Sequence, residues 1–204
     1  MRVCILGAGL SSLTLAKALV NQKIYVDVVA ENKLFVPNQT RTLGISKSNV
    51  KFFNNNIINI NKILWKLKKI EVFSDNLIDE KLLNFEKNND YLFSIIKNYQ
   101  LFKILEKSLS SNKHFTRIYK KNVFYYKDYN LVINTNLNNL TTKKYFSKKI
   151  TKKYNSFAYT TIIHHEEILN NVATQIFTKL GPLAFLPISN NQTSIVYSID
   201  NLNN

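Results

Sequence analysis

The apolar positions at the start of the chain change their spacing twice. Residues 3–6 form an unbroken apolar run, residues 7–9 read Gly-Ala-Gly, and residues 10–20 then carry apolar side chains at helical spacing. A second extended run follows at residues 24–29. A strand, a glycine-bearing turn, a helix and a second strand in this order predict a βαβ unit of the kind that binds nucleotides.

Further along the chain, helical periodicity alternates with short apolar runs that are bounded by turn residues. Leu180-Gly181-Pro182 supplies the turn chemistry within the last group of strands. The expected elements are a loop at 32–44, a helix after Ser46, a strand at 70–73 with a hairpin partner at 82–85, a helix over 90–109, strands at 123–125, 131–133 and 157–163, and an antiparallel meander of 172–177, 183–186 and 194–199.

These elements predict an α/β fold. A Rossmann-like part begins with the βαβ unit, and a mostly antiparallel β part is interleaved with it along the chain. The chain of 204 residues is long enough for one large domain or two small ones.

The glycine turn is the candidate site. Gly7 would allow a tight turn out of the strand, and Gly9 would let backbone N–H groups approach a pyrophosphate with no Cβ in the way. The helix N-terminus would face the phosphates with its free donors and its partial positive charge. The residues expected to bind the cofactor here are Gly7, Ala8, Gly9, Leu10, Ser11 and Ser12. An ordinary tight turn between strand and helix is the alternative.

Two positions differ from the usual dinucleotide fingerprint. Ser12 stands where a third glycine is usual, and its small side chain still permits close packing of helix and strand. Ala30 stands where an acidic residue usually binds the ribose, and Glu31 follows it. Either Glu31 makes the ribose contact after a one-residue shift, or that contact is missing.

The net charge of +15 and the isoelectric point near 9.8 raise the question of a polyanionic partner. The basic residues are scattered, no nucleic-acid-binding motif accompanies them, and the chain is rich in Asn, Lys and Ile, as an AT-rich genome would produce. We therefore expect no nucleic-acid partner, and weak attraction to anionic lipid as the stronger alternative.

Cysteine and histidine usage points away from metal and disulfide chemistry. Cys4 is the single cysteine, so neither a disulfide framework nor a zinc spacing exists. His164 and His165 are adjacent, and neighbouring side chains on a strand point to opposite sides, so we expect no metal site. The start of the chain does not have the pattern of a signal peptide, and no apolar stretch approaches the length of a membrane span. We therefore expect a cytoplasmic protein.

Several segments resemble the FAD-dependent aromatic hydroxylases of ubiquinone biosynthesis, that is, the 2-polyprenyl-6-methoxyphenol hydroxylase-like members of the para-hydroxybenzoate hydroxylase type of class A flavoprotein monooxygenases. The resemblance runs from Met1 to about Ile199, which is about the first half of a typical member. The similar segments are 7–9 (GAG), 41–48 (RTLGISKS), 64–65 (LW), 154–158 (YNSFA), 165–166 (HE), 173–178 (ATQIFT), 181–188 (GPLAFLPI) and 194–197 (SIVY).

The resemblance implies FAD as the cofactor, NAD(P)H as the reductant and a small aromatic or polyprenyl-phenol substrate. It implies that Gly7 and Gly9 bind the pyrophosphate and that Arg41 lies beside the FAD, where a guanidinium suits phosphate or ribose oxygens. It assigns residues 1–65 and 90–145 to the FAD-binding part and residues 66–89 and 146–204 to the antiparallel β substrate part. No catalytic residue is assigned.

The sequence departs from the family at three places. Tyr99 stands for the second flavin arginine, Asn136-Leu137 stands for an Asp-Gly motif that serves flavin and NADPH, and the Gly-Asp motif that lies downstream in the family is absent. Two hypotheses stay open. The chain is an FAD-dependent monooxygenase, truncated before the C-terminal part or completed by another chain and peripheral on the inner face of the membrane. Alternatively, it is a non-catalytic remnant or split-protein fragment that binds a dinucleotide weakly or not at all.

Overall fold

The computed structural model describes residues 1–30, 37–76, 80–87, 90–119, 126–146, 148, 150–152 and 154–200. These residues form two compact units, each assembled from separate segments of the chain. Unit 1 comprises Met1–Pro37, Phe52–Asn59 and Tyr99–Thr151, and unit 2 comprises Asn38–Lys51, Ile60–Asn98 and Lys152–Asn204.

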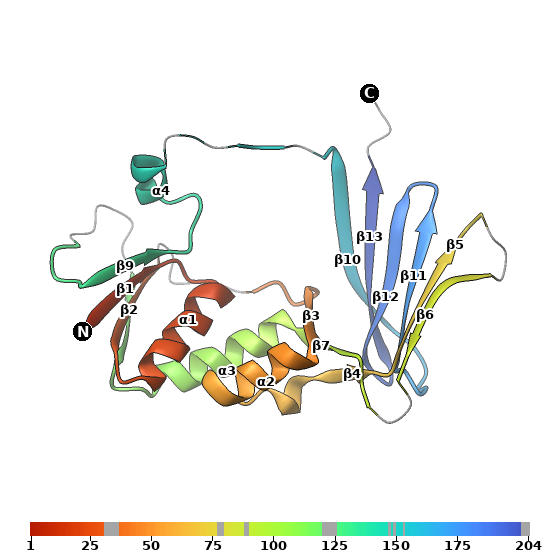
Figure 1. Cartoon of the computed structure of the whole chain (residues 1–204), viewed down its shortest axis with the longest axis horizontal. Coiled ribbons are helices and arrows are strands. Elements are labelled where there is room, and N and C mark those ends of the chain that lie inside the picture. The colour runs from red at the N-terminus through yellow and green to blue at the C-terminus, as the bar shows by residue number, and fades with distance from the viewer. Residues whose placement is uncertain are drawn as a thin grey trace. The chain divides into compact units, whose positions relative to one another are not determined.

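A parallel sheet forms the centre of unit 1. Its strand order is β8 (Phe115–Tyr119), β2 (Tyr25–Ala30), β1 (Arg2–Leu6) and β9 (Leu131–Asn134). β1 pairs in parallel with both β2 and β9, and β2 pairs in parallel with β8. Helix α1 (Leu10–Asn21) connects β1 to β2 (Figure 1), and α3 (Asn98–Ser110) precedes β8 along the chain.

Both faces of this sheet are covered. Cys4 and Leu6 pack with Val29 against Ile118, Tyr126, Tyr129 and Val132 on one face. Val3 and Ile5 alternate with them along β1, so they point to the other face and are fully buried there. The helices bury one stripe each, which is Leu13, Ala16 and Val20 in α1 and Leu101, Leu105 and Leu109 in α3. Spacings of three and four residues keep each stripe on one helix face.

Unit 2 contains two sheets. The larger one has the order β10 (Ser156–His164), β13 (Gln192–Asp200), β12 (Gly181–Ser189), β11 (Val172–Thr178), β5 (Lys69–Ser74) and β6 (Lys81–Glu86), and its strands are antiparallel except for the parallel pair β11–β5. The smaller antiparallel sheet has the order β3 (Thr42–Ser46), β7 (Phe93–Lys97) and β4 (Trp65–Leu67). Figure 1 shows the long strands β10 to β13 side by side.

The core of unit 2 joins its two sheets. Leu67 and Ile95 of the small sheet pack with Ala173 and Ile188 of the large sheet.

The remaining helices are α2 (Lys47–Asn56), the 3₁₀ helix at Asn61–Ile63 and α4 (Leu140–Tyr145).

Most expected elements are confirmed. The βαβ start, the helix after Ser46, the hairpin of β5 with β6, strand β10 and the meander of β11, β12 and β13 all occur where the sequence predicts them. The apolar run at 131–133 predicts a buried strand. The strand is confirmed as β9, which pairs only with β1 among the described strands, but it is not buried, because Leu131 is exposed and its next residues are half-buried. The expected strand at 123–125 lies outside the described residues.

One expected helix is wrong over its first half. The pattern at 90–109 predicts a single helix, but Phe93–Lys97 forms strand β7 and α3 begins at Asn98. β7 pairs on one side with β3 and on the other with β4, so it is the central strand of the small sheet. Central pairing supplies hydrogen bonds on both edges, and it outweighs a local pattern that suits either structure. Strands β3, β4 and β8 were not expected, and β3 includes residues 42–44 at the end of the expected loop.

The division of the chain into an FAD-binding part and a substrate part stays a prediction.

Among the described residues, no helix combines the length and the apolar character that a bilayer crossing requires.

Candidate dinucleotide-binding site

The candidate site lies at the carboxyl edge of the parallel sheet in unit 1. β1 ends at Leu6 and β9 ends at Asn134, so the turns that follow both strands meet at this edge. Ligands of open α/β sheets bind at this edge. A cavity of about 400 Å³ opens there. Its lining residues are Gly7, Ala8, Gly9, Ser11, Ser12, Val29, Thr135, Asn136, Leu137 and Asn139.

Gly7 makes the turn that carries the chain out of β1. Its N–H donates to the carbonyl oxygen of Val29 at 2.9 Å, and its φ of +127° lies in a region that L side chains rarely adopt. A Cβ at this position would lie 2.4 Å from Thr135 Oγ1 and 3.0 Å from Ser12 Oγ. Both the backbone angle and the close approach therefore require glycine.

Ser12 binds the start of α1 to the end of β9. The Thr135 hydroxyl donates to the carbonyl oxygen of Leu6 at 2.9 Å, and Ser12 Oγ lies 2.7 Å from Thr135 Oγ1. Because the threonine hydroxyl has one proton and donates it to Leu6, the Ser12 hydroxyl is the donor in the second bond. Ser12 is 1% exposed, so this serine replaces a third glycine with a satisfied polar contact.

Gly9 caps α1 without supplying a side chain. Its φ of −80° and ψ of −177° are extended, and a Cβ built on it meets no atom within 4 Å. The space beside it therefore opens into the cavity. The first N–H groups of a helix have no intrahelical acceptor, and the first turn of α1 contains no acidic residue. An anion in the cavity would meet these donors and the positive end of the helix dipole.

The second wall of the cavity is an asparagine-rich turn. Asn134 Oδ1 accepts from the N–H of Asn136 at 3.0 Å, and Asn136 Oδ1 accepts from the N–H of Asn138 at 3.1 Å. Asn139 caps the short helix α4 by accepting from the N–H of Thr141 at 2.8 Å. These local bonds fix the turn, and they place Asn136-Leu137, the positions of the family's Asp-Gly motif, on the cavity.

The described lining contains hydroxyls, amides and backbone groups but no charged side chain. A neighbouring cavity of about 690 Å³ shares Asn136 and Leu137 with the first one, and its lining includes Lys143, Phe146 and Lys148. Lys143 and Lys148 therefore line the neighbouring cavity and not the candidate site.

The other expected site residues have different positions. Leu10 is the first residue of α1 and does not line the cavity, and Glu31 lies outside the described residues. Arg41 belongs to unit 2, where its carbonyl oxygen accepts from the N–H of Asn98 at 3.0 Å. Thr40 and Thr42 on either side contact Thr160 and Ser194 through their hydroxyls, each at 3.3 Å. The exposed Arg41 side chain is thus presented by an anchored segment.

The sequence pattern did not point to three of the lining residues, Val29, Thr135 and Asn139. All three follow from topology, since Thr135 and Asn139 come after β9 and Val29 lies near the end of β2. The available signal was the mostly polar run Asn-Thr-Asn-Leu-Asn-Asn directly after the apolar residues 131–133. The family resemblance connects Asn136-Leu137 to the cofactor, but only the pairing of β1 with β9 brings Thr135 and Asn139 to the glycine turn.

Both histidines of the adjacent pair contact neighbouring protein groups. The His165 ring nitrogens lie 2.7 Å from the carbonyl oxygen of Glu166 and 3.0 Å from Thr193 Oγ1. His164 is on β10 and contacts Gln192. Across the described part of the chain, no three His, Cys, Asp or Glu side chains are grouped so as to hold a metal ion.

A network of ionisable groups in unit 1 that does not line the glycine cavity surrounds the buried carboxylate of Asp27. Asp27 Oδ2 accepts from Arg2 Nε at 2.9 Å and from the Tyr129 hydroxyl at 2.6 Å. Burial and the hydrogen bond to Asp27 raise the pKa of Tyr129, and the same carboxylate raises the pKa of Arg2. Burial also raises the pKa of the Cys4 thiol to about 12. These groups stabilise the sheet and do not line the glycine cavity.

Comparison with known proteins gives a likeness of structure but none of sequence. No protein-family model and no curated protein matches the sequence. The structure is similar to that of PqsL from Pseudomonas aeruginosa in complex with 2-aminobenzoylacetate, at a TM-score of 0.75, 12% identity and coverage of 98% of this chain and 61% of PqsL.

Two other similar structures are a variant of HpxO from Klebsiella pneumoniae complexed with FAD and 2,6-dihydroxypyridine-3-hydroxylase from Arthrobacter nicotinovorans. For HpxO the TM-score is 0.74 at 11% identity, with 100% of this chain and 58% of HpxO covered. For the hydroxylase the TM-score is 0.72 at 11% identity, with 100% and 57% covered. The chain therefore shares the mixed α/β fold of these proteins and spans about 60% of their length.

Proposed function

We propose that the chain binds FAD at the glycine cavity of unit 1 and functions as part of an FAD-dependent monooxygenase that hydroxylates an aromatic ring. The observation that carries this proposal is the open space beside Gly9, where a Cβ would meet no protein atom at the N-terminus of a 12-residue helix. A turn that served only to connect β1 with α1 would have no need of a cavity at this point.

The residues present fit a pyrophosphate. The backbone N–H groups of the first turn of α1 would bind its oxygens, and the Ser11 hydroxyl and the amides of Asn136 and Asn139 lie on the same cavity. No carboxylate among the described lining residues opposes an anion. When bound, FAD would supply the redox and oxygen chemistry, while the protein would orient the cofactor and exclude water. The family resemblance also makes Arg41 a candidate donor to FAD oxygens.

The substrate class rests on the similar structures and on the family resemblance. PqsL was crystallised with 2-aminobenzoylacetate, and another similar protein is named a dihydroxypyridine hydroxylase. We infer a small aromatic substrate, with a polyprenyl phenol of ubiquinone biosynthesis as the specific candidate, and NAD(P)H as the reductant. The charge of +15 supports a peripheral position on an anionic membrane surface.

The chain spans 57–61% of the similar structures, and the activity proposed here is that of the whole proteins. One observation favours a non-catalytic alternative, since Asn136-Leu137 replaces the family's Asp-Gly motif on the cavity wall. In that case the protein would bind a dinucleotide weakly or not at all.

Uptake of FAD by the purified chain tests the proposal. We expect added FAD to bind with quenched flavin fluorescence, and we expect binding to be lost in Gly9→Asp. The aspartate would cap α1 and preserve or increase stability, but it would place a negative charge where the pyrophosphate binds.

Gly9→Asn is the matched control, because it has the same shape and no charge. Asparagine should weaken FAD binding less than aspartate does. A parent chain that takes up no FAD would overturn the proposal and leave the non-catalytic alternative. Equal FAD binding by the parent and by Gly9→Asp would show that the cofactor lies elsewhere.

A further inference from the structure

Strand β6 of unit 2 exposes apolar side chains at the edge of a sheet. All six of its residues, Lys81–Glu86, are exposed, although β6 pairs with β5 along its length. Leu83 is 54% exposed and Phe85 is 51% exposed. Scattered apolar side chains on a surface are ordinary, but two at alternate positions on one strand lie on the same face of it.

These two side chains extend the apolar face of β5 that leads to the core. Leu83 is opposite Val72, and Phe85 is opposite Ile70. Ile70 packs against the core cluster that includes Leu67 and Ile95. The apolar layer therefore continues outward from the core to Phe85 and Leu83, where none of the described residues covers it.

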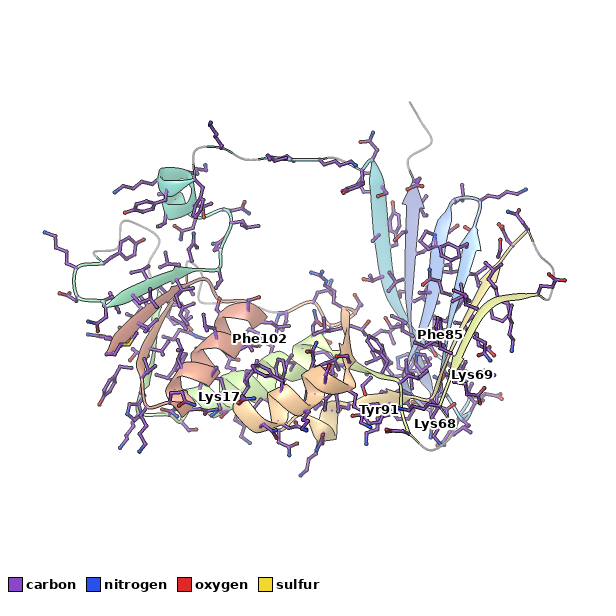
Figure 2. The ribbon with its side chains drawn as sticks, in the orientation of Figure 1. Lys17, Lys68, Lys69, Phe85, Tyr91 and Phe102 are labelled. Carbon is purple, nitrogen blue, oxygen red and sulfur yellow. The ribbon has the colours of Figure 1, made fainter. Side chains whose placement is uncertain are left out.

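Lysines flank this apolar edge. The N–H of Lys87 donates to the carbonyl oxygen of Lys68 at 3.1 Å, which places the end of β6 beside the start of β5. Lys66 and Lys68 are exposed, and Lys66 Nζ lies 5.0 Å from the centre of the Tyr91 ring. Figure 2 shows Phe85, Lys68, Lys69 and Tyr91 in the same part of unit 2.

Nearby carboxylates form ion pairs with some of the lysines in this region but not with all of them. Glu71 pairs with Lys69 at 3.0 Å and with Lys81 at 2.5 Å. Lys87 and Lys47 pair with Asp90. None of the ion pairs among the residues that the structure describes includes Lys66 or Lys68. Lys66 and Lys68 therefore lack a described carboxylate partner, and Lys68 lies beside the end of the strand that carries Leu83 and Phe85.

We propose that this edge, defined by Leu83, Phe85, Lys66, Lys68 and Tyr91, docks on an anionic phospholipid surface. Phe85 and Leu83 would enter the interfacial layer, Tyr91 would lie at headgroup depth, and the lysines would contact lipid phosphates through their flexible side chains. The charge of the whole chain would attract it to the same surface. The docking surface locates the membrane association of the proposed function, but it does not depend on FAD binding.

Co-sedimentation with vesicles tests this surface. We expect the full chain to sediment with vesicles of phosphatidylcholine and phosphatidylserine, to bind pure phosphatidylcholine far more weakly, and to be released by salt. Lys66→Gln with Lys68→Gln should lower the affinity roughly 30-fold, at about fivefold for each lysine. Leu83→Ser with Phe85→Ser should lower it at least about tenfold.

Two control variants match these changes at other places. Phe157→Ser alters an aromatic on β10 that is more exposed than Phe85, at the opposite edge of the same sheet. Lys113→Gln removes an exposed lysine of unit 1. Both should bind vesicles like the parent. Because the altered side chains are exposed, FAD uptake should stay unchanged in every variant.

Three results would overturn the proposal. The parent could fail to sediment with phosphatidylserine vesicles, the paired variants could bind as tightly as the parent, or the control variants could lose as much affinity as the paired ones. A chain that bound an acidic protein but no vesicles would also overturn the proposal, because the first of these results would then hold. If the chain binds vesicles but takes up no FAD, the proposed docking surface is supported and the proposed FAD-dependent function is rejected.

Discussion

The sheets of the two units differ in how they meet solvent. In unit 1, β1 and β2 are buried at every position except their first residue. In unit 2, β6 is exposed at every position, and β10 is exposed at all but one. Parallel strands need cover on both faces, whereas antiparallel strands tolerate water on one face. In unit 1 a ligand can therefore reach β1 and β2 only at their ends, whereas in unit 2 it can also reach the faces and the edges of the large sheet.

The two units carry separate natural probes. The single cysteine, Cys4, is buried in β1 of unit 1, and the single tryptophan, Trp65, is in β4 of unit 2. Thiol labelling of Cys4 therefore reports opening of unit 1, and tryptophan fluorescence reports unfolding of unit 2.

The largest expected effect comes from two glycines with positive φ, one in each unit. Gly7→Ala would place a Cβ 2.4 Å from Thr135 Oγ1, and Gly181→Ala would place one 2.2 Å from the carbonyl oxygen of Ser198. We expect each variant to lose about 2–4 kcal/mol of unfolding free energy. In urea titrations, Gly7→Ala should shift the Cys4 labelling transition, and Gly181→Ala should shift the Trp65 transition.

Gly9→Ala is the control for this pair, because its φ is −80° and its Cβ meets no atom within 4 Å. It should cost less than about 1 kcal/mol. If the two positive-φ variants shift both transitions equally, the units do not unfold as separate bodies and the comparison between them loses its basis.

The buried thiol of Cys4 should make unit 1 sensitive to alkaline pH. Its pKa is about 12 in the folded chain, against 9.0 for an ordinary thiol, because burial disfavours the thiolate. The native state then holds the proton more tightly than the unfolded state. Stability is fully present below about pH 9 and falls by roughly 1.4 kcal/mol per pH unit as the pH rises toward 12.

Urea denaturation of the parent and of Cys4→Ala across this pH range isolates the contribution of the thiol. Other groups titrate in the same range in both proteins, so the difference in slope belongs to Cys4. Identical slopes would contradict the expected effect of burial on this group.

The smallest expected effect concerns the ion pairs on β5. Hydrogen bonds from Lys81 and Lys69 lower the pKa of Glu71 below its usual 4.5. Their contribution is present above that pH and is lost as the pH falls through the lowered pKa. Since the lysines are partly exposed, Glu71→Gln should cost less than about 1 kcal/mol near neutral pH, measured by Trp65 fluorescence in urea. A loss of about 3 kcal/mol would mean that the pair acts as a buried one.

Prediction from the sequence succeeded in both units where an element carries its own local signals. The first strand, turn and helix were predicted because residues 2–20 carry their own periodicity and glycine signals. Phe93–Lys97 was mistaken for helix because its apolar residues suit either period. Its pairing with β3 and β4 involves residues far away along the chain, and no local pattern records that pairing.

By itself, the amino-acid sequence determined the glycine turn, the helix behind it and the strands of the meander, because each depends on neighbours within a few residues. Only the tertiary structure decided that Thr135 and Asn136 would meet Gly7, that Ser12 would donate to Thr135, and that β6 would remain uncovered. Those outcomes depend on which strands pair, and pairing is a competition among distant segments for hydrogen bonds and apolar cover.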